Sequence, residues 1–186
     1  LTALIGLVSL AYAQHHFTIN ASIYSKALDE VKRVNIYLPS DYYVNEDIYY
    51  PVIIYLHGGN GNQNEGFSTA NFYYYQHFND TLSESPPAIV VSPDGGCEPY
   101  AGSGWVNSAL YGNYEDYVVE DLIEFIESNF RVMPQKEFRF ITGYSMGGFG
   151  SAYLAVRHPD LFRGCAPSSA CWLSTMDTVH AVWRDK

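Results

Sequence analysis

The chain has 186 residues, of which 47% are hydrophobic and 16% are charged, and its 20 acidic and 10 basic side chains give a net charge of −10. This composition supplies enough apolar material for the core of one domain, and it excludes intrinsic disorder, which requires low hydrophobicity and high charge. A negatively charged chain without a basic cluster also lacks the electrostatic signature of a nucleic-acid-binding protein.

The first segment, residues 1–13, is apolar and uncharged up to Ala11 and ends in the triplet Ala11-Tyr12-Ala13. An apolar run that ends in a small-x-small triplet is typical of a secretory signal peptide, although the charged residues that normally precede the run are missing. The run is too short to span the ~30 Å hydrocarbon core of a membrane. We therefore expect a partial signal peptide over 1–13, one domain over 14–186, and a secreted or periplasmic protein without a stable membrane span.

The next segments predict strands. Residues 33–38 alternate polar and apolar side chains, which predicts an antiparallel strand with one solvated face. The continuous apolar runs 50–56 and 88–91 predict strands that are buried on both faces, as in a parallel sheet. Between these two runs, the aromatic-rich residues 67–78 predict a partly helical segment.

Residues 116–130 predict an amphipathic helix, because apolar side chains recur every four residues at Val118, Leu122, Ile126 and Phe130. The acidic side chains at the complementary positions are expected to form a solvated face; they are Glu120, Asp121, Glu124 and Glu127. A strand over 138–142, a helix over 146–157 and another buried strand over 162–166 follow. This alternation predicts an α/β fold with a mostly parallel sheet and flanking helices.

The junction between the strand 138–142 and the helix that begins at 146 reads Gly143-Tyr144-Ser145-Met146-Gly147. This is the Gly-x-Ser-x-Gly pattern of a nucleophile elbow, in which a serine on a sharp strand-to-helix turn projects its hydroxyl above the sheet. Glycines flank the serine because side chains there would collide with neighbouring backbone. The free N–H groups and the dipole of the helix N-terminus favour a developing oxyanion. Ser145 is therefore the predicted catalytic nucleophile.

Acyl transfer also requires a second oxyanion donor from the loop after an earlier strand, and the glycine-rich run 56–61 follows such a strand. We predict the backbone N–H groups of Met146 and Gly59 as the two donors, with Asn60 as the alternative to Gly59. His57 precedes Ser145, whereas in this arrangement the catalytic histidine follows the serine. We therefore interpret His57 as a ring that is hydrogen-bonded beneath the loop.

The segment GYSMGGFGSAYLAVRHPDLF resembles the esterase D-like and feruloyl esterase-like family of α/β-hydrolases. The segments YLHGGNG, SPDGG and WVNSALYGNYEDYVVEDLI are similar to the same family, in the same order along the chain. The resemblance implies an α/β-hydrolase fold and a serine carboxylesterase that uses no metal or organic cofactor. Its substrate would be a small-molecule or carbohydrate ester.

The resemblance also implies that the triad acid and histidine follow two later strands, and only 186 − 145 = 41 residues follow the serine. We therefore expect a fragment that is truncated at both ends and inactive as it stands, with the C-terminal part of the fold missing and the acid and histidine beyond Lys186. Within the chain, His158 and Asp160 are expected to act locally at a helix end. Asp177 and His180, one helical turn apart, would have to fold back on Ser145 over a short path, and Asp185 is the remaining acid.

The sequence leaves three functions open. The first is hydrolysis of extracellular esters, with carbohydrate-linked esters as one class because the chain carries 17 tyrosines and a secretory leader. The alternatives are acyl transfer to a sugar alcohol and a catalytically dead module that binds carbohydrate or another partner. Trp105, Tyr111 and Tyr114 could line a substrate pocket or simply pack over the sheet.

The three cysteines cannot all pair within one chain, and their spacing predicts no zinc site. Cys165 lies in an apolar segment and is expected to be buried, whereas Cys97 lies in a glycine-rich loop and is expected to be exposed. The pairing of Cys97, Cys165 and Cys171 is not determined by their spacing.

Overall fold

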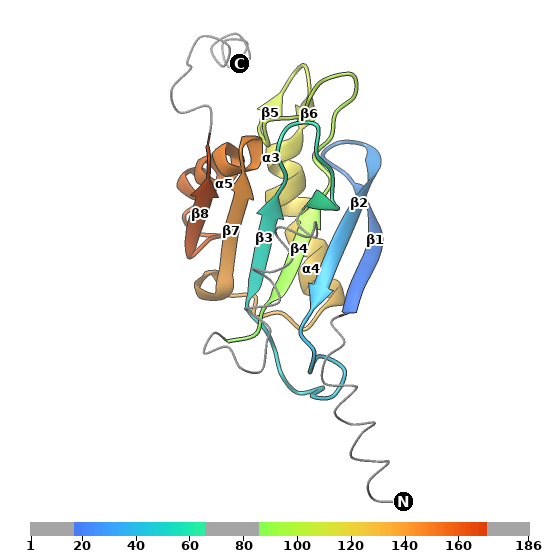
Figure 1. Ribbon diagram of the computed structural model, residues 1–186, viewed down its shortest axis with the longest axis vertical. Coiled ribbons are helices and arrows are strands. Elements are labelled where there is room, and N and C mark those ends of the chain that lie inside the picture. The colour runs from blue at the N-terminus through green and yellow to red at the C-terminus, as the bar shows by residue number, and fades with distance from the viewer. Residues whose placement is uncertain (1–16, 66–85, 171–186) are drawn as a thin grey trace, which may run out of the picture.

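The computed structural model describes residues 17–65 and 86–170 (Figure 1). The predicted signal peptide, the aromatic segment 67–78 and four candidate residues, Cys171, Asp177, His180 and Asp185, lie outside these ranges.

A six-stranded sheet in the order β1-β2-β4-β3-β7-β8 forms the centre of the structure. Its strands are β1 (Phe17–Ser25), β2 (Glu30–Leu38), β3 (Val52–Leu56), β4 (Ile89–Pro93), β7 (Arg139–Tyr144) and β8 (Gly164–Ser168). The pairs β1–β2 and β2–β4 are antiparallel, whereas β3–β4, β3–β7 and β7–β8 are parallel. The predicted mostly parallel sheet is therefore present. A short pair, β5 (Asn107–Ser108) and β6 (Gly112–Asn113), is antiparallel and forms a separate sheet.

Two helical segments lie behind the sheet in the view of Figure 1. One contains α3 (Tyr114–Asp116), the π-helical segment η2 (Tyr117–Leu122) and α4 (Ile123–Asn129), which follow one another without a break. The other is α5 (Met146–Arg157), which has the predicted bounds. A short 3₁₀ turn, η3 (Lys136–Phe138), precedes β7.

The core lies between the sheet and these helices. Alternate strand residues, including Val34, Ile54 and Val91, face helix residues such as Leu122 and Leu154, and all of these side chains are buried. The opposite face of the sheet carries a smaller cluster of Tyr37, Tyr55 and Val90. Because strand side chains alternate between faces, the two clusters account for the continuous apolar runs of the central strands.

The prediction that β2 has one solvated face is wrong, because every residue from Val34 to Leu38 is buried. β2 lies between β1 and β4, and Tyr37 packs with Tyr55 and Val90 on the face expected to be wet. Asn35 is also buried there, and its side-chain amide donates to Asn64 Oδ1 at 2.8 Å.

The predicted strand at 162–166 corresponds to β8, but the prediction that this strand is buried is wrong. β8 is the edge strand of the sheet, and its residues from Cys165 to Ser168 are exposed. Cys165 is therefore exposed and not buried, whereas Cys97 is half-buried against the core and not exposed.

Two carboxylates of the α3–α4 segment are buried, and one of them, Asp121, was predicted to lie on the solvated face. Asp121 accepts hydrogen bonds from Ser25 Oγ at 2.6 Å and from the Ala27 N–H at 3.0 Å, and so anchors the β1–β2 turn. Glu115, which lies in the first turn, is 2% exposed. Glu120, Glu124 and Glu127 are exposed as predicted.

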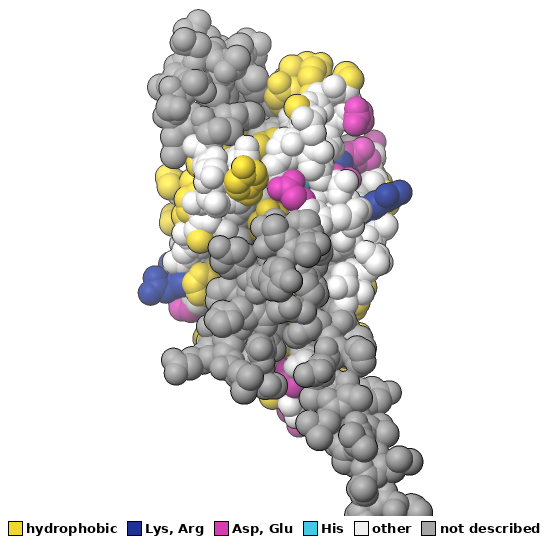
Figure 2. All heavy atoms as spheres, viewed as in Figure 1, with side chains coloured by type: hydrophobic (Ala, Val, Ile, Leu, Met, Phe, Trp, Pro, Cys, Tyr) yellow, Lys and Arg dark blue, Asp and Glu magenta, His cyan; other side chains and the backbone are white. Residues whose placement is uncertain are grey.

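Figure 2 shows hydrophobic side chains on the surface where the β5–β6 pair lies, and others beside β7 and β8. The exposed apolar residues of these regions include Tyr100, Leu110, Phe140 and Tyr144. Within residues 17–65 and 86–170, no helix has the length and apolar character needed to cross a membrane.

Candidate active site

Ser145 lies between the last residue of β7, Tyr144, and the first residue of α5, Met146. Its backbone has φ 55° and ψ −113°, a conformation that is rare for any residue with a side chain. Strain of this kind persists only where the surrounding structure enforces it, and it is concentrated at functional sites. The Ser145 N–H donates to Ser168 O at 2.9 Å, and its carbonyl accepts from the Phe149 N–H at 3.0 Å. The turn is thus held by β8 on one side and by α5 on the other.

The two glycines of the elbow are required by close backbone contacts. A Cβ on Gly143 would lie 2.5 Å from the carbonyl oxygens of Gly147 and Leu56. A Cβ on Gly147 would lie 1.8 Å from Leu56 O. Non-bonded atoms cannot approach so closely, so any side chain at either position would push α5 away from β3.

The loop after β3 lies directly beside the serine. A Cβ on Gly58 would be 3.6 Å from Ser145 Cβ, in ordinary van der Waals contact. The loop closes in a β-turn, in which the Gly61 N–H donates to Gly58 O at 3.1 Å and Asn60 has φ 59°. Asparagine tolerates this left-handed conformation better than most residues with a side chain.

The hydrogen bonds of the loop distinguish its backbone donors. The Gly58 N–H donates to the carboxylate of Glu65, and the Asn60 N–H donates to Ala101 O at 2.5 Å. The Gly61 N–H is used in the turn. Among the four residues 58–61, only Gly59 has an N–H without an acceptor in the described part of the chain. This arrangement favours Gly59 over Asn60 as the loop donor.

A third segment, the loop after β4, contacts both predicted oxyanion donors. A Cβ on Gly102 would lie 2.4 Å from Met146 Sδ and 3.9 Å from Gly59 Cα. The Gly104 N–H also approaches Met146 Sδ, at 3.4 Å. As the first residue of α5, Met146 has an N–H with no acceptor inside the helix. The loops after β3, β4 and β7 thus meet at Ser145, at the carboxyl ends of three neighbouring parallel strands.

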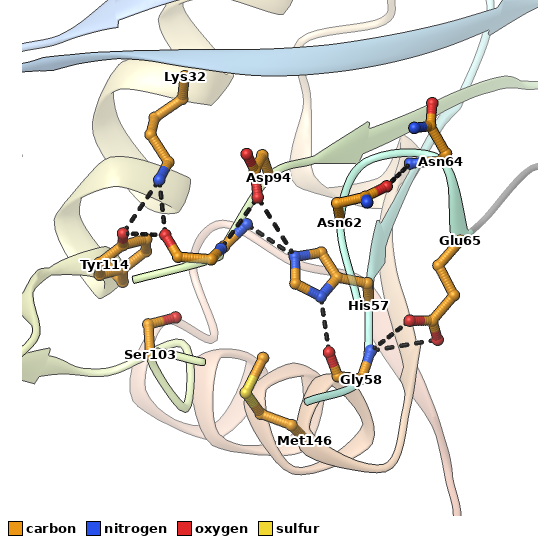
Figure 3. A network of polar contacts seen from close by, with 12 residues as sticks. Lys32, His57, Gly58, Asn62, Asn64, Glu65, Asp94, Ser103, Tyr114 and Met146 are labelled. Atoms are coloured by element: carbon orange, nitrogen blue, oxygen red, sulfur yellow. Dashed lines mark hydrogen bonds and ion pairs between the residues drawn. The ribbon is translucent and has the colours of Figure 1, made fainter. Parts of the chain in front are cut away.

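His57 is fully buried beneath this loop, as predicted. Its Nδ1 lies 2.7 Å from Gly58 O, and its Nε2 accepts from the Gly95 N–H at 2.8 Å. Because a carbonyl can only accept and an amide N–H can only donate, the ring carries its proton on Nδ1. The imidazole therefore ties the loop after β3 to the loop after β4, and Figure 3 shows it between Gly58 and Asp94.

A buried lysine extends this network to β2. Lys32 Nζ donates to Gly96 O at 2.7 Å and to Tyr114 Oη at 3.0 Å (Figure 3). It also lies 3.2 Å from Glu30 Oε1. Burial raises the pKa of the Asp94 carboxyl, but contacts that favour its charged form, including the Gly96 N–H and the Lys32 ammonium, hold this pKa below its ordinary value. No sequence motif marks Lys32, and its role was not predicted.

The three aromatic residues proposed to line a pocket have different positions. Trp105 is fully buried against Gly95 and Gly150, and its indole N–H donates to His57 O at 3.2 Å. Tyr114 is 2% exposed and belongs to the core. Tyr111 is half-exposed and packs edge-to-face against the ring of Tyr100, with centroids 4.9 Å apart. Of the three residues, only Tyr111 is accessible to solvent.

His158 and Asp160 lie at the C-terminal end of α5, one helix length away from Ser145. His158 Nε2 lies 2.8 Å from the buried carboxylate of Glu115, which agrees with the predicted local role. Within the described residues, no group of three or more histidine, cysteine and acidic side chains is arranged to hold a metal ion.

A comparison with protein families finds that a family model named Esterase matches residues 25–185. Among curated proteins, an esterase of Mycobacterium tuberculosis (strain H37Rv) is 33% identical over 141 residues. The match covers 73% of this chain and 28% of that protein.

Three solved structures of hydrolases have a fold similar to that of this chain. A ferulic acid esterase superposes with a TM-score of 0.74 at 24% identity, covering 81% of this chain and 58% of its own. An S-formylglutathione hydrolase from Agrobacterium tumefaciens gives a TM-score of 0.66 at 20% identity, and the match covers 81% of this chain and 56% of that hydrolase. A fluorophosphonate-binding serine hydrolase of Staphylococcus aureus gives a TM-score of 0.66 at 22% identity, and the match covers 82% of this chain and 56% of that hydrolase. The chain thus spans somewhat more than half the length of each of these structures.

Proposed function

The chain belongs to the esterase family and has the α/β-hydrolase fold, and we propose that it supplies the nucleophile and the oxyanion hole of a serine carboxylic-ester hydrolase. The observation that carries this proposal is the position of Ser145. It occupies a strained strand-to-helix turn beside the loop after β3. Among the described residues, the N–H groups of Met146, which follows Ser145, and of Gly59, which lies in that loop, have no acceptor.

In the proposed reaction, Ser145 Oγ attacks the ester carbonyl carbon while a histidine takes the hydroxyl proton. The carbonyl oxygen becomes an oxyanion that accepts hydrogen bonds from the N–H groups of Met146 and Gly59. Collapse of the tetrahedral intermediate breaks the ester C–O bond, and the histidine returns the proton to the leaving alcohol. Water then hydrolyses the acyl-enzyme by the same steps. We propose that the triad histidine and acid lie beyond Lys186 in the full-length protein.

Substitution of the nucleophile tests this proposal in the protein at its natural length. We expect S145A to lower kcat for p-nitrophenyl acetate by at least about 10³-fold, because the remaining oxyanion hole alone gives little turnover. The matched control is S128A, an exposed serine on α4, which should hydrolyse the ester at the parental rate. Equal turnover by S145A and the parent would reject Ser145 as the nucleophile.

We further propose extracellular esters of ring-containing acids or sugars as the substrates. The exposed Tyr100 and the half-exposed Tyr111 pair next to Ala101, whose carbonyl anchors the oxyanion loop. The structural similarity to a ferulic acid esterase points to the same class of ester. We expect Y111A to lower kcat/KM for methyl ferulate more than for p-nitrophenyl acetate, and equal losses would contradict this substrate class.

The extracellular location rests on the leader-like residues 1–13. We expect the mature protein from the producing cells to be exported and to begin after Ala13. N-terminal sequencing of the protein from the cell exterior measures this directly, and an intact leader on a protein found inside the cells would contradict it.

A further inference from the structure

The peptide groups of Gly58 are held from two sides. The Gly58 N–H points at the carboxylate of Glu65, at 3.2 Å from Oε1 and 3.1 Å from Oε2. The Gly58 carbonyl accepts from the Nδ1–H of His57 at 2.7 Å and from the Gly61 N–H at 3.1 Å. Figure 3 shows His57 and Glu65 on either side of Gly58, above Met146 at the start of α5.

These contacts determine the direction of the next N–H group. A peptide unit is planar and trans, so its C=O and N–H point in opposite directions. The carbonyl of Gly58 and the N–H of Gly59 belong to one such unit. Because His57 and Gly61 fix the carbonyl, the Gly59 N–H points away from the buried imidazole. The preceding peptide unit, which carries the Gly58 N–H, is held separately by the Glu65 carboxylate, so both peptide units of Gly58 are fixed.

The Glu65 carboxylate is held in place by its contacts with Gly61 and Tyr55. A Cβ on Gly61 would lie 2.0 Å from Glu65 Oε2, so the carboxylate occupies the space that a side chain at position 61 would need. Tyr55 Oη donates to Oε1 at 3.4 Å from the end of β3. A Cβ on Gly58 would lie 3.5 Å from Glu65 Oε1 and 3.6 Å from Ser145 Cβ. The carboxylate and the nucleophile therefore flank the same glycine.

We propose that Glu65 is a positioning residue of the oxyanion hole. Its carboxylate binds the Gly58 N–H and thereby leaves the Gly59 N–H as the single loop donor, aimed at the developing oxyanion. Glu65 acts through the Gly58 N–H. The inference rests on the proposed esterase function, and it predicts that Glu65 affects the transition state more than substrate binding.

The test compares two substitutions of Glu65 in the protein at its natural length. E65A removes the acceptor, and we expect kcat to fall about 10- to 100-fold with KM within about threefold, since loss of a whole oxyanion donor costs ~10²–10³. E65Q keeps a carbonyl oxygen in the same place, and we expect kcat within about fivefold of the parent. Hydrogen–deuterium exchange should show faster exchange of the Gly58 and Gly59 amides in E65A than in E65Q.

The control is E137A, an exposed glutamate in η3 at the opposite end of β7, which should retain parental kcat. If E65A does not fold, G61A gives the second route, because its Cβ displaces the Glu65 carboxylate and should lower kcat in the same way. The proposal is overturned if E65A or G61A keeps kcat within twofold of the parent, or if E65Q loses as much as E65A. Absence of Ser145-dependent turnover in the parent would instead overturn the esterase function, and this proposal with it.

Discussion

Gly147 and Leu56 are in backbone-to-backbone contact: a Cβ on Gly147 would lie 1.8 Å from Leu56 O. Leu56 is the last residue of β3, and Gly147 is in the first turn of α5. The contact sets the distance between the serine turn and the loop after β3. It therefore keeps Met146 close to the loop that contains Gly59, although the two residues are far apart in the sequence.

Substitution of Gly147 tests this contact. We expect G147A to lower the free energy of unfolding by about 3 kcal/mol, because the added methyl meets backbone and not a flexible side chain. Urea denaturation followed by circular dichroism measures the change. The matched control is G164A at the start of β8, where nothing lies within 4 Å of the added Cβ. This variant should be as stable as the parent or slightly more so, and equal effects of the two substitutions would contradict the contact.

The strain at Ser145 predicts a difference in stability between two variants of this residue. Glycine adopts φ 55° and ψ −113° without steric cost, whereas alanine retains the strain of the serine. We expect S145G to be more stable to urea than S145A by about 1 kcal/mol, within the range typical of a strained backbone position. An S145A variant that is at least as stable as S145G would show that the turn is not strained.

The buried carboxylate of Glu115 predicts a stability that depends on pH. Burial raises the pKa of Glu115, but hydrogen bonds from Arg157 at 2.7 Å, His158 at 2.8 Å and Tyr153 at 3.0 Å outweigh it, so the pKa is lowered below 4.5. A carboxyl whose folded pKa is below its unfolded pKa stabilises the protein above the unfolded value. This stabilisation is lost as the pH falls through the folded pKa.

We therefore expect the free energy of unfolding to fall less in E115Q than in the parent between about pH 6 and about pH 3.5. Urea denaturation at several pH values measures the two slopes. E137Q, in which the substituted glutamate is exposed, is the control and should follow the parent. Identical acid slopes for E115Q and the parent would mean that Glu115 has the same pKa in the folded and unfolded chain.

The two described cysteines should react at different rates. Cys165 is exposed on the edge strand β8. Burial of Cys97 raises the pKa of its thiol, which reduces the fraction of the reactive thiolate. We expect iodoacetamide to modify Cys165 well before Cys97 at neutral pH, and peptide mapping of a time course distinguishes the two. Faster modification of Cys97 would contradict the burial of its loop.

The regular elements could be predicted where side-chain periodicity determines them. Helix α5 and the apolar strands β3 and β4 appear close to their predicted bounds, because these segments are buried and their patterns are unbroken. The four-residue repeat of Val118, Leu122 and Ile126 exceeds the 3.6-residue period of an α-helix, and the wider π-helical turn of η2 keeps these side chains on the buried face. The strand β1 was not predicted, although Ile19, Ala21 and Ile23 alternate with polar residues and could have revealed it.

Some features of the candidate site could also be predicted from the sequence, and others could not. The elbow and the glycine-rich loop are predictable from sequence, since their close backbone contacts demand glycine at fixed positions. Glu65 and Lys32 are not, because each acts through a hydrogen bond to backbone that only tertiary structure brings near. Asp121 and Glu115 resemble the exposed acids of an amphipathic helix and differ only in the partners that the fold supplies. Exposure of Cys165 likewise follows from the place of β8 at the sheet edge, which periodicity does not reveal.

The activation of Ser145 is the central claim, and covalent labelling tests it most directly. The protein at its natural length is treated with a fluorophosphonate, digested, and the adduct is located by mass spectrometry, with S145A as the control. We predict a single phosphonate on Ser145, formed in proportion to the loss of esterase activity and absent from S145A. An unlabelled Ser145 in a folded protein, or the same labelling of the parent and S145A, would contradict its role as the nucleophile.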